Sequence, residues 1–152
     1  MFLFGHSAVG LVAASWTMNP VLALVSGFVS HYAADAIPHG DEDLGKWTKT
    51  GNEVFRLTLL MLLDLSVLAL AFAFLWREVG WQWWQVAAIA GACAPDFMWG
   101  AEKVLGRKIF GPLGAFHKCN HNRWKVSVPA GWGVPAQIAL TGALWWFIVF
   151  RF

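Results

Sequence analysis

The sequence predicts an all-α integral membrane bundle of about five transmembrane helices with one interfacial amphipathic segment. Of its 152 residues, 58% are hydrophobic and only 13% are charged, and the mean hydropathy is +0.53. Soluble domains carry about 25% charged residues, so this composition is typical of a small polytopic membrane protein. The length indicates a single domain over residues 1–152.

Apolar runs separated by polar or turn-forming segments carry the topology prediction. Spans are expected at 2–18, 21–38, 54–76, 83–99 and 131–150. The first run is at the short limit for crossing a bilayer, so four spans with a re-entrant first helix is the competing topology. Between the last two spans, the basic and aromatic segment 100–130 is expected to lie at the interface.

Charge and tryptophan positions set the expected orientation. The five-span threading places nine of the 11 Lys and Arg residues on the side of the N-terminus, which the positive-inside rule makes cytoplasmic. Tryptophans fall at both predicted interfaces: Trp16, Trp76, Trp81, Trp83, Trp84, Trp145 and Trp146 on the far side, and Trp47, Trp99, Trp124 and Trp132 on the near side. The start of the chain lacks a basic n-region, so no signal peptide is expected. We expect the inner (plasma) membrane of a prokaryote.

Net charge and cysteine content exclude some classes of function. A net charge of +2 is too small to indicate a nucleic-acid partner, so membrane lipid is the expected partner, and a homo-oligomer is left open. The two cysteines, Cys93 and Cys119, form neither a disulfide framework nor a zinc ribbon.

The second apolar run contains ionisable residues that are unusual in a span. His31 and Asp35 are four residues apart, so their side chains share one helical face. An Asp at a helix centre costs ~2.5–3.5 kcal/mol on insertion scales, which makes it a functional-site candidate. Pro38 stops the helix and His39 follows it. Two imidazoles and a carboxylate are typical of hydrolytic zinc sites; the competing interpretation is hydrogen bonding between helices.

Further candidates lie at the ends of other runs. His117 and His121 have the i, i+4 spacing of a helical metal-chelating pair, but no Glu lies between them, so the metalloprotease signature is absent. The alternative is a solvated basic helix. Asp96 follows Pro95, which is expected to break or kink the fourth helix and to leave Asp96 as a ligand or general base. His6 opens the first span.

The threading places all five histidines on, or opening toward, the same membrane face. We therefore predict one metal site in the cytoplasmic half, with a divalent ion, zinc first, and the candidate ligands His6, His31, Asp35, His39, Asp96, His117 and His121. Asp64 or Asp41 is the candidate general base. Three other roles for Asp64 stay open: orienting a histidine, hydrogen bonding while protonated, or pairing with Arg56. Lys118 and Arg123 are candidates for holding an anionic headgroup, although basic residues at an interface also attract lipid without any such role.

Several of these residues resemble a known family. The pattern His6-x-x-x-Gly10, the buried His31 and Asp35, and Pro95-Asp96 closing a later helix are similar to the predicted membrane-bound metal-dependent hydrolases, also labelled LexA-binding inner-membrane-associated hydrolases. The resemblance covers about the first 43 residues and 95–99. Members often continue the Pro-Asp pair with a second Asp and a His, whereas here Phe97 and Met98 follow, so His117 and His121 are left as substitutes.

Together these patterns favour a metal-dependent hydrolase that acts on a lipid-like or headgroup-bearing substrate from the cytoplasmic side. The alternatives are a non-enzymatic metal or proton carrier, a haem protein, and a subunit of a membrane assembly that performs no chemistry. The absence of ionisable residues deep in the far half counts against a proton path, and the absence of a second deep histidine counts against haem.

Overall fold

The fold is all-α. The computed structural model describes residues 1–152 except 41, 122, 124–127 and 152, and this part of the chain contains seven helices and no strand. They are α1 (Leu3–Ala14), α2 (Pro20–Asp35), α3 (Glu42–Lys49), α4 (Glu53–Val79), α5 (Trp83–Leu105), α6 (Pro112–His121) and α7 (Ala130–Arg151).

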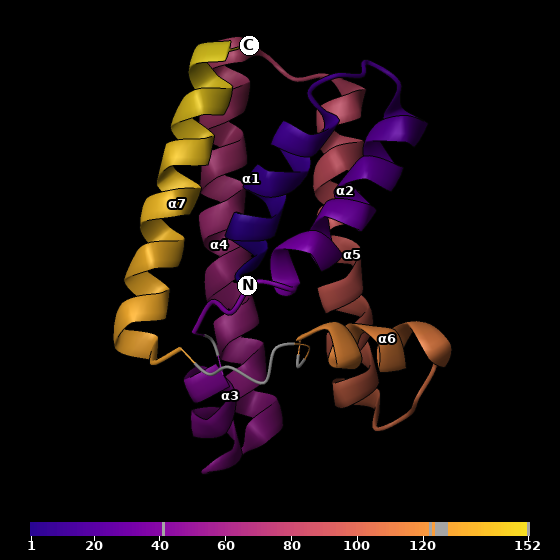
Figure 1. Ribbon diagram of the computed structural model, residues 1–152, viewed down its shortest axis with the longest axis vertical. Coiled ribbons are helices and arrows are strands. Elements are labelled where there is room, and N and C mark those ends of the chain that lie inside the picture. Colours follow the sequence, from indigo (N-terminus) through magenta and orange to yellow (C-terminus); the bar gives the residue numbers. More distant parts are fainter. Residues whose placement is uncertain (41, 122, 124–127, 152) are drawn as a thin grey trace.

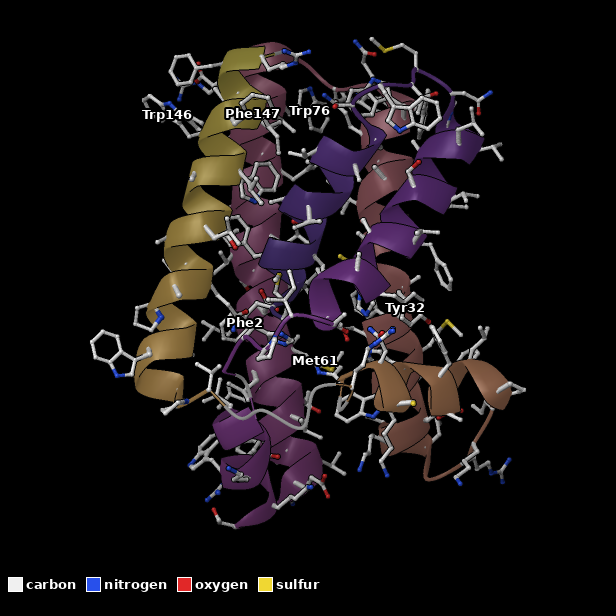
Figure 2. All side chains as sticks on the ribbon, viewed as in Figure 1. Phe2, Tyr32, Met61, Trp76, Trp146 and Phe147 are labelled. Atoms are coloured by element: carbon white, nitrogen blue, oxygen red, sulfur yellow. The ribbon has the colours of Figure 1, made fainter. Side chains whose placement is uncertain are left out.

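The helices are arranged around α1. Figure 1 shows α1 between the pair α4 and α7 on one side and the pair α2 and α5 on the other. The short helices α3 and α6 lie at the end of the bundle away from the C-terminus. Figure 2 places Trp76 and Trp146 together at the C-terminal end, as expected for residues of one aromatic belt.

Local sequence signals explain where the long helices begin and end. The Asn19 side chain accepts hydrogen bonds from the backbone N–H groups of Val21 and Leu22, and Pro20 occupies the first turn of α2. Asn52 caps α4 in the same way by accepting from Phe55 N–H at 3.0 Å. Gly106 ends α5 with φ +63°, a conformation that favours glycine.

Close packing of α2 on α5 forms the centre of the bundle. A Cβ on Gly91 would lie 2.1 Å from the Leu24 carbonyl oxygen, and a Cβ on Gly27 would lie 2.2 Å from that of Ala88. A Cβ on Gly10 of α1 would lie 2.6 Å from the Cβ of Ala92. Only glycine permits such contacts between helix backbones, which are common where helices associate in membranes.

Among the described residues, two helices are long and apolar enough to cross a bilayer by length and composition. They are α4 over Glu53–Glu78, with a mean hydropathy of 2.4 in its most apolar window, and α7, with 1.5. Only 6% of that window of α4 is buried inside the protein, and most of its apolar side chains are exposed, although Leu68 and Leu75 belong to the core. The core helix of a soluble protein would be mostly buried.

The first apolar run is shorter as a helix than the sequence suggests. α1 ends at Ala14 and has 12 residues, equivalent to about 18 Å, against about 30 Å for the hydrocarbon core. It ends early because Thr17 Oγ1 accepts from Asn19 N–H, and Asn19 already caps α2. The five-span topology therefore stays a prediction.

The fourth run is longer than expected. Pro95 was expected to break or kink its helix, yet α5 continues for ten residues beyond it and ends at Leu105. The segment 100–130 is thus divided between the last turn of α5, a loop and α6.

We expect Gly91→Ala to lower the free energy of unfolding by about 1–3 kcal/mol, because its methyl group would overlap the Leu24 carbonyl. The matched control is Gly142→Ala in α7, where a Cβ would meet no atom within 4 Å and where alanine favours the helix. Unfolding of both variants in detergent, followed by circular dichroism, measures the difference. Equal stability of the two variants would contradict the close α2–α5 packing.

Candidate metal centre

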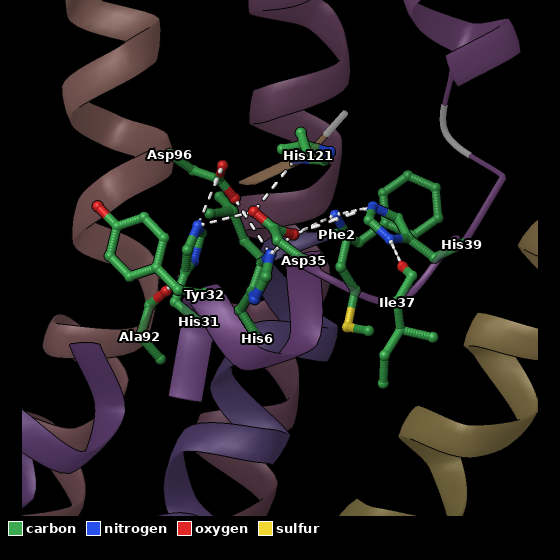
Figure 3. Close-up of polar contacts among 12 residues, drawn as sticks. Phe2, His6, His31, Tyr32, Asp35, Ile37, His39, Ala92, Asp96 and His121 are labelled. Carbon is green, nitrogen blue, oxygen red and sulfur yellow. Dashed lines mark hydrogen bonds and ion pairs between the residues drawn. The ribbon is translucent and has the colours of Figure 1, made fainter. Parts of the chain in front are cut away.

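The carboxylate of Asp35, the last residue of α2, forms the centre of a buried polar cluster. Asp35 is only 2% exposed. Its two oxygens lie 3.0–3.1 Å from the Nε2 atoms of four histidines: His6, His31, His117 and His121. Figure 3 shows His6, His31 and His121 around this carboxylate. The four histidines and the acids Asp35 and Asp96 therefore lie together, whereas Asp64 does not join them and a role as metal ligands stays a prediction.

The i, i+4 pair on α2 has the expected geometry. His31 Nε2 lies 3.0 Å from Asp35 Oδ2, so the two side chains share one helical face. The other ring nitrogen, Nδ1, lies 2.7 Å from the carbonyl oxygen of Ala92 on α5 and donates its hydrogen to it. This hydrogen bond leaves Nε2 with its lone pair directed at the cluster, which is the arrangement typical of metal-binding histidines.

His6 brings α1 into the cluster. It is fully buried, and its ring stacks on that of His31 with centroids 3.9 Å apart. Its Nε2 atom lies 3.0 Å from Asp35 Oδ1, but neither ring nitrogen makes a geometrically acceptable hydrogen bond to any described residue. A buried polar atom without a hydrogen bond is costly, and a cation at the cluster would remove this cost for Nε2.

Asp96 supplies a second carboxylate from α5. Its oxygens lie 3.6 Å from His6 Nε2, 3.5 Å from His117 Nε2 and 3.9 Å from His31 Nε2. The Asp96 side chain is 21% exposed, so this edge of the cluster is accessible to water.

The helix α6 presents the second histidine pair. His117 and His121 lie one turn apart, and the Nε2 atom of each is 3.1 Å from Asp35 Oδ2. Asn120 Nδ2 donates to the Tyr32 carbonyl at 2.7 Å and so attaches α6 to α2. Before α6, Glu102 accepts hydrogen bonds from two backbone N–H groups of the connecting loop. Cys119, between the two histidines, is exposed.

His39 lies at the edge of the cluster rather than on the helix. α2 ends at Asp35, three residues before Pro38, so His39 is carried on the following loop. Its Nε2 atom lies 3.9 Å from Asp35 Oδ1, and its Nδ1 donates to the Ile37 carbonyl. Gln137 of α7 donates to the His39 carbonyl and holds the loop in place.

These residues fit the requirements of a divalent metal site. The ligand atoms form two groups, and within each group they all lie within 4.8 Å of one another. The first group is His6, His31, Asp35 and Asp96, and the second is Asp35, His117 and His121. Within the first group, His31 Nε2 lies 3.0 Å from Asp35 Oδ2, and His6 Nε2 lies 3.6 Å from Asp96 Oδ2. Two ligands of a tetrahedral zinc ion are separated by about 3.3 Å when its bonds are about 2.0–2.1 Å long. A metal ion could therefore be held here with little rearrangement.

Asp64 has a contact that the sequence did not suggest. Its carboxylate, on α4, accepts hydrogen bonds from the backbone N–H groups of Leu3 at 2.5 Å and Phe4 at 3.1 Å. It therefore caps the first turn of α1, whose own N-cap, Phe2, offers no side-chain acceptor. Arg56 does not turn toward it but donates to the Trp47 carbonyl and the Thr50 hydroxyl. A general-base role for Asp64 stays a prediction.

The other candidates lie outside the cluster. Lys118 lines a cavity of about 440 Å³ that adjoins the histidines, together with Asp64 and Asp96. Arg123 is exposed just beyond α6. Asp41 lies outside the described residues.

Sequence reasoning missed several residues that build the site. Gln137 and Glu102 hold the two loops that carry or precede cluster histidines. Gln137 is a polar residue within an otherwise apolar run, and this pattern could have indicated a structural role. The Met1 nitrogen lies 3.0 Å from Asp35 Oδ1, a contact that spacing does not reveal.

We expect Asp64→Ala to lower the free energy of unfolding by about 1–2 kcal/mol, because the first turn of α1 would lose both acceptors. Asp64→Asn keeps one acceptor oxygen and should lose less. Ser66→Ala, one half-turn along α4, is the control, since its hydroxyl bonds only within its own helix. Equal unfolding midpoints for Asp64→Ala and Ser66→Ala would rule out the capping role.

Comparisons with protein-family models, curated proteins and solved structures give no match for this chain. The resemblance to the membrane-bound metal-dependent hydrolases therefore stays a prediction. The function has to be argued from the geometry around Asp35.

Proposed function

We propose that this protein is a membrane-embedded, metal-dependent hydrolase that acts on a lipid-like, headgroup-bearing substrate. The observation that supports it best is the convergence of four imidazole Nε2 atoms on the Asp35 carboxylate at 3.0–3.1 Å. Hydrogen bonding between helices needs far fewer such groups. A His-rich set with carboxylates is the ligand chemistry of catalytic zinc sites.

The ligand arrangement favours two ions rather than one. Asp35 belongs to both groups of ligand atoms, so it would take part in holding both ions. His6, His31 and Asp96 would complete one position, and His117 and His121 the other, with His39 adjoining. Paired ions about 3.5–4 Å apart are common in enzymes that hydrolyse phosphate esters. Zinc is the first candidate because imidazole and carboxylate ligands suit it.

One edge of the cluster is open to water and substrate. When bound, a divalent ion would lower the pKa of a coordinated water toward ~7 and stabilise negative charge developing on the substrate. The side chains of Asp96 and His121 are 21% and 26% exposed, so water and substrate can reach this edge of the cluster. Asp64, which lines the adjoining cavity, and Asp41 remain the candidate bases.

A membrane location is supported by the uncovered apolar surface of α4. That surface, with a mean hydropathy of 2.4 over its best window, suits lipid and would be unfavourable in water. We infer the five-span threading in a prokaryotic inner membrane, with the cytoplasmic N-terminus that the Lys and Arg distribution predicts. Self-association through α4 is compatible with this placement.

A non-enzymatic metal-binding role is the second candidate. It is favoured by the complete burial of His6 and His31, because structural metal sites are closed. The exposed edge at Asp96 and His121 argues for catalysis instead.

We expect the purified protein to contain about two divalent ions per chain, and Asp35→Asn to lose most of both because both groups of ligands share Asp35. His121→Ala should retain about one. Glu78→Gln, an exposed carboxylate near the opposite end of α4, is the matched control. Elemental analysis after size-exclusion chromatography measures the content. Wild-type levels in Asp35→Asn would end the metal assignment.

We expect hydrolysis of a chromogenic ester or phosphate ester to stop on chelation and to return on adding zinc. Asp35→Asn should reduce kcat/KM by about 100-fold or more, whereas Glu78→Gln should leave it unchanged. A metal-loaded wild-type protein that turns over neither class of ester would favour the non-enzymatic alternative.

A further inference from the structure

We infer that the cavity beside the metal centre binds an amphiphile with one alkyl chain and a phosphate group. This inference rests on the proposed function and specifies its substrate class. The cavity holds about 440 Å³, within the range of about 300–1,000 Å³ typical of small-molecule sites. Its walls come from the first residues of the chain and from α3, α4, α5 and α6, at the end of the bundle where Figure 1 shows α3 and α6.

One wall of the cavity is an apolar stripe on α4. Leu57, Leu60 and Met61 line it, and Asp64 continues the same helical face at its inner end. These residues are half-buried, whereas Leu59 and Leu63 between them are exposed at 52% and 63%. The stripe therefore separates the cavity from the lipid-facing surface of the same helix. It has the chemistry to hold an alkyl chain that enters from the bilayer.

Met61 defines the far side of this stripe. A Cβ on Gly100 of α5 would lie 3.1 Å from Met61 Cε, so the methionine reaches across to α5 where that helix has no side chain. An unbranched thioether adapts readily to a flexible chain.

The cavity is lined by charged residues of both signs, three lysines and the carboxylates of Glu53, Asp64 and Asp96. Lys49, Lys103 and Lys118 line it from three different helices. Lys103 contacts Glu53 at 3.3 Å and lies 5.7 Å from the Trp99 ring centre, and Glu53 and Trp99 line the same cavity. Glu53 contacts Lys103, Asp64 accepts from the first turn of α1, and Asp96 belongs to the cluster around Asp35. The lysines beside the proposed divalent ions then favour a phosphate, which has several anionic oxygens, over a cationic headgroup.

The two parts of the cavity meet at the metal centre. Asp96, His117 and His121 belong both to the cluster around Asp35 and to the cavity lining. A phosphate held by the lysines would lie next to these residues, with its alkyl chain along Leu57 and Leu60. This orientation places the ester linkage of a phospholipid-like substrate at the site of the proposed hydrolysis.

Photo-crosslinking tests the inference without requiring turnover. The wild-type protein in nanodiscs of zwitterionic lipid is exposed to a dodecyl phosphonate carrying a diazirine on its chain, whose P–C bond cannot be hydrolysed as an ester. We expect Leu57, Leu60 and Met61 to be labelled about tenfold more than with the matched trimethylammonium probe. Lys118→Glu and Lys49→Glu should each reduce this labelling about tenfold, and Lys108→Glu, an exposed lysine beyond α5, should not.

Two outcomes would overturn the inference. The first is equal labelling of Leu60 and of the lipid-facing Leu63 by both probes, which would mean adsorption from the bilayer only. The second is that inorganic phosphate displaces the phosphonate probe while Leu57, Leu60 and Met61 are not labelled. This result would mean that the cavity binds free phosphate and not an alkyl chain. Ester hydrolysis measured in parallel separates this inference from the proposed function. Turnover without labelling refutes only the substrate class, and labelling without turnover refutes only the hydrolase.

Discussion

A carboxylate buried in a protein interior needs partners that offset its lost hydration, and Asp35 dictates much of this structure for that reason. The effective penalty for burying an ion is several kcal/mol even after relaxation. Asp35 is 2% exposed and has imidazoles from α1, α2 and α6 around it. Each of these helices must therefore end, turn or cross where its histidine can reach one point.

Close helix packing makes this convergence possible. α2 and α5 approach so closely at Gly27 and Gly91 that the Ala92 carbonyl can orient His31. α1 is a short helix, and the Asp64 carboxylate on α4 fixes its position by accepting hydrogen bonds from the backbone of its first turn. The small residues and the capping carboxylate thus serve the site as much as the fold, because each fixes the position of a cluster histidine.

The sequence predicted the residues of the cluster better than the contacts that hold them in place. The spacing of His31 with Asp35 and of His117 with His121 was sufficient to place each pair on one helical face. The end of α1 was not predictable from hydropathy, because competing backbone hydrogen bonds near Thr17 and Asn19 decide it.

Tertiary contacts account for the remaining differences between sequence and structure. α5 continues past Pro95 because it is packed along its length against α1 and α2, and packing overrides a local preference. The contact of Asp64 with the first turn of α1 joins residues about sixty positions apart, and that of Gln137 with His39 joins residues nearly a hundred apart. No local pattern encodes such pairs.

The composition of the cluster also bears on how the protein folds. Without a cation, His6 keeps two buried ring nitrogens with no hydrogen bond among the described residues, and His31 and His117 bring two Nε2 atoms to 3.3 Å. Ligation of His6 Nε2 and of the two adjoining Nε2 atoms to the pair of ions proposed above would remove the unfavourable contacts of these three atoms. A metal that binds the native state and not the unfolded chain shifts the folding equilibrium toward the native state. The ions that would support hydrolysis would then also hold α1, α2, α5 and α6 together, so that stability and activity depend on one site.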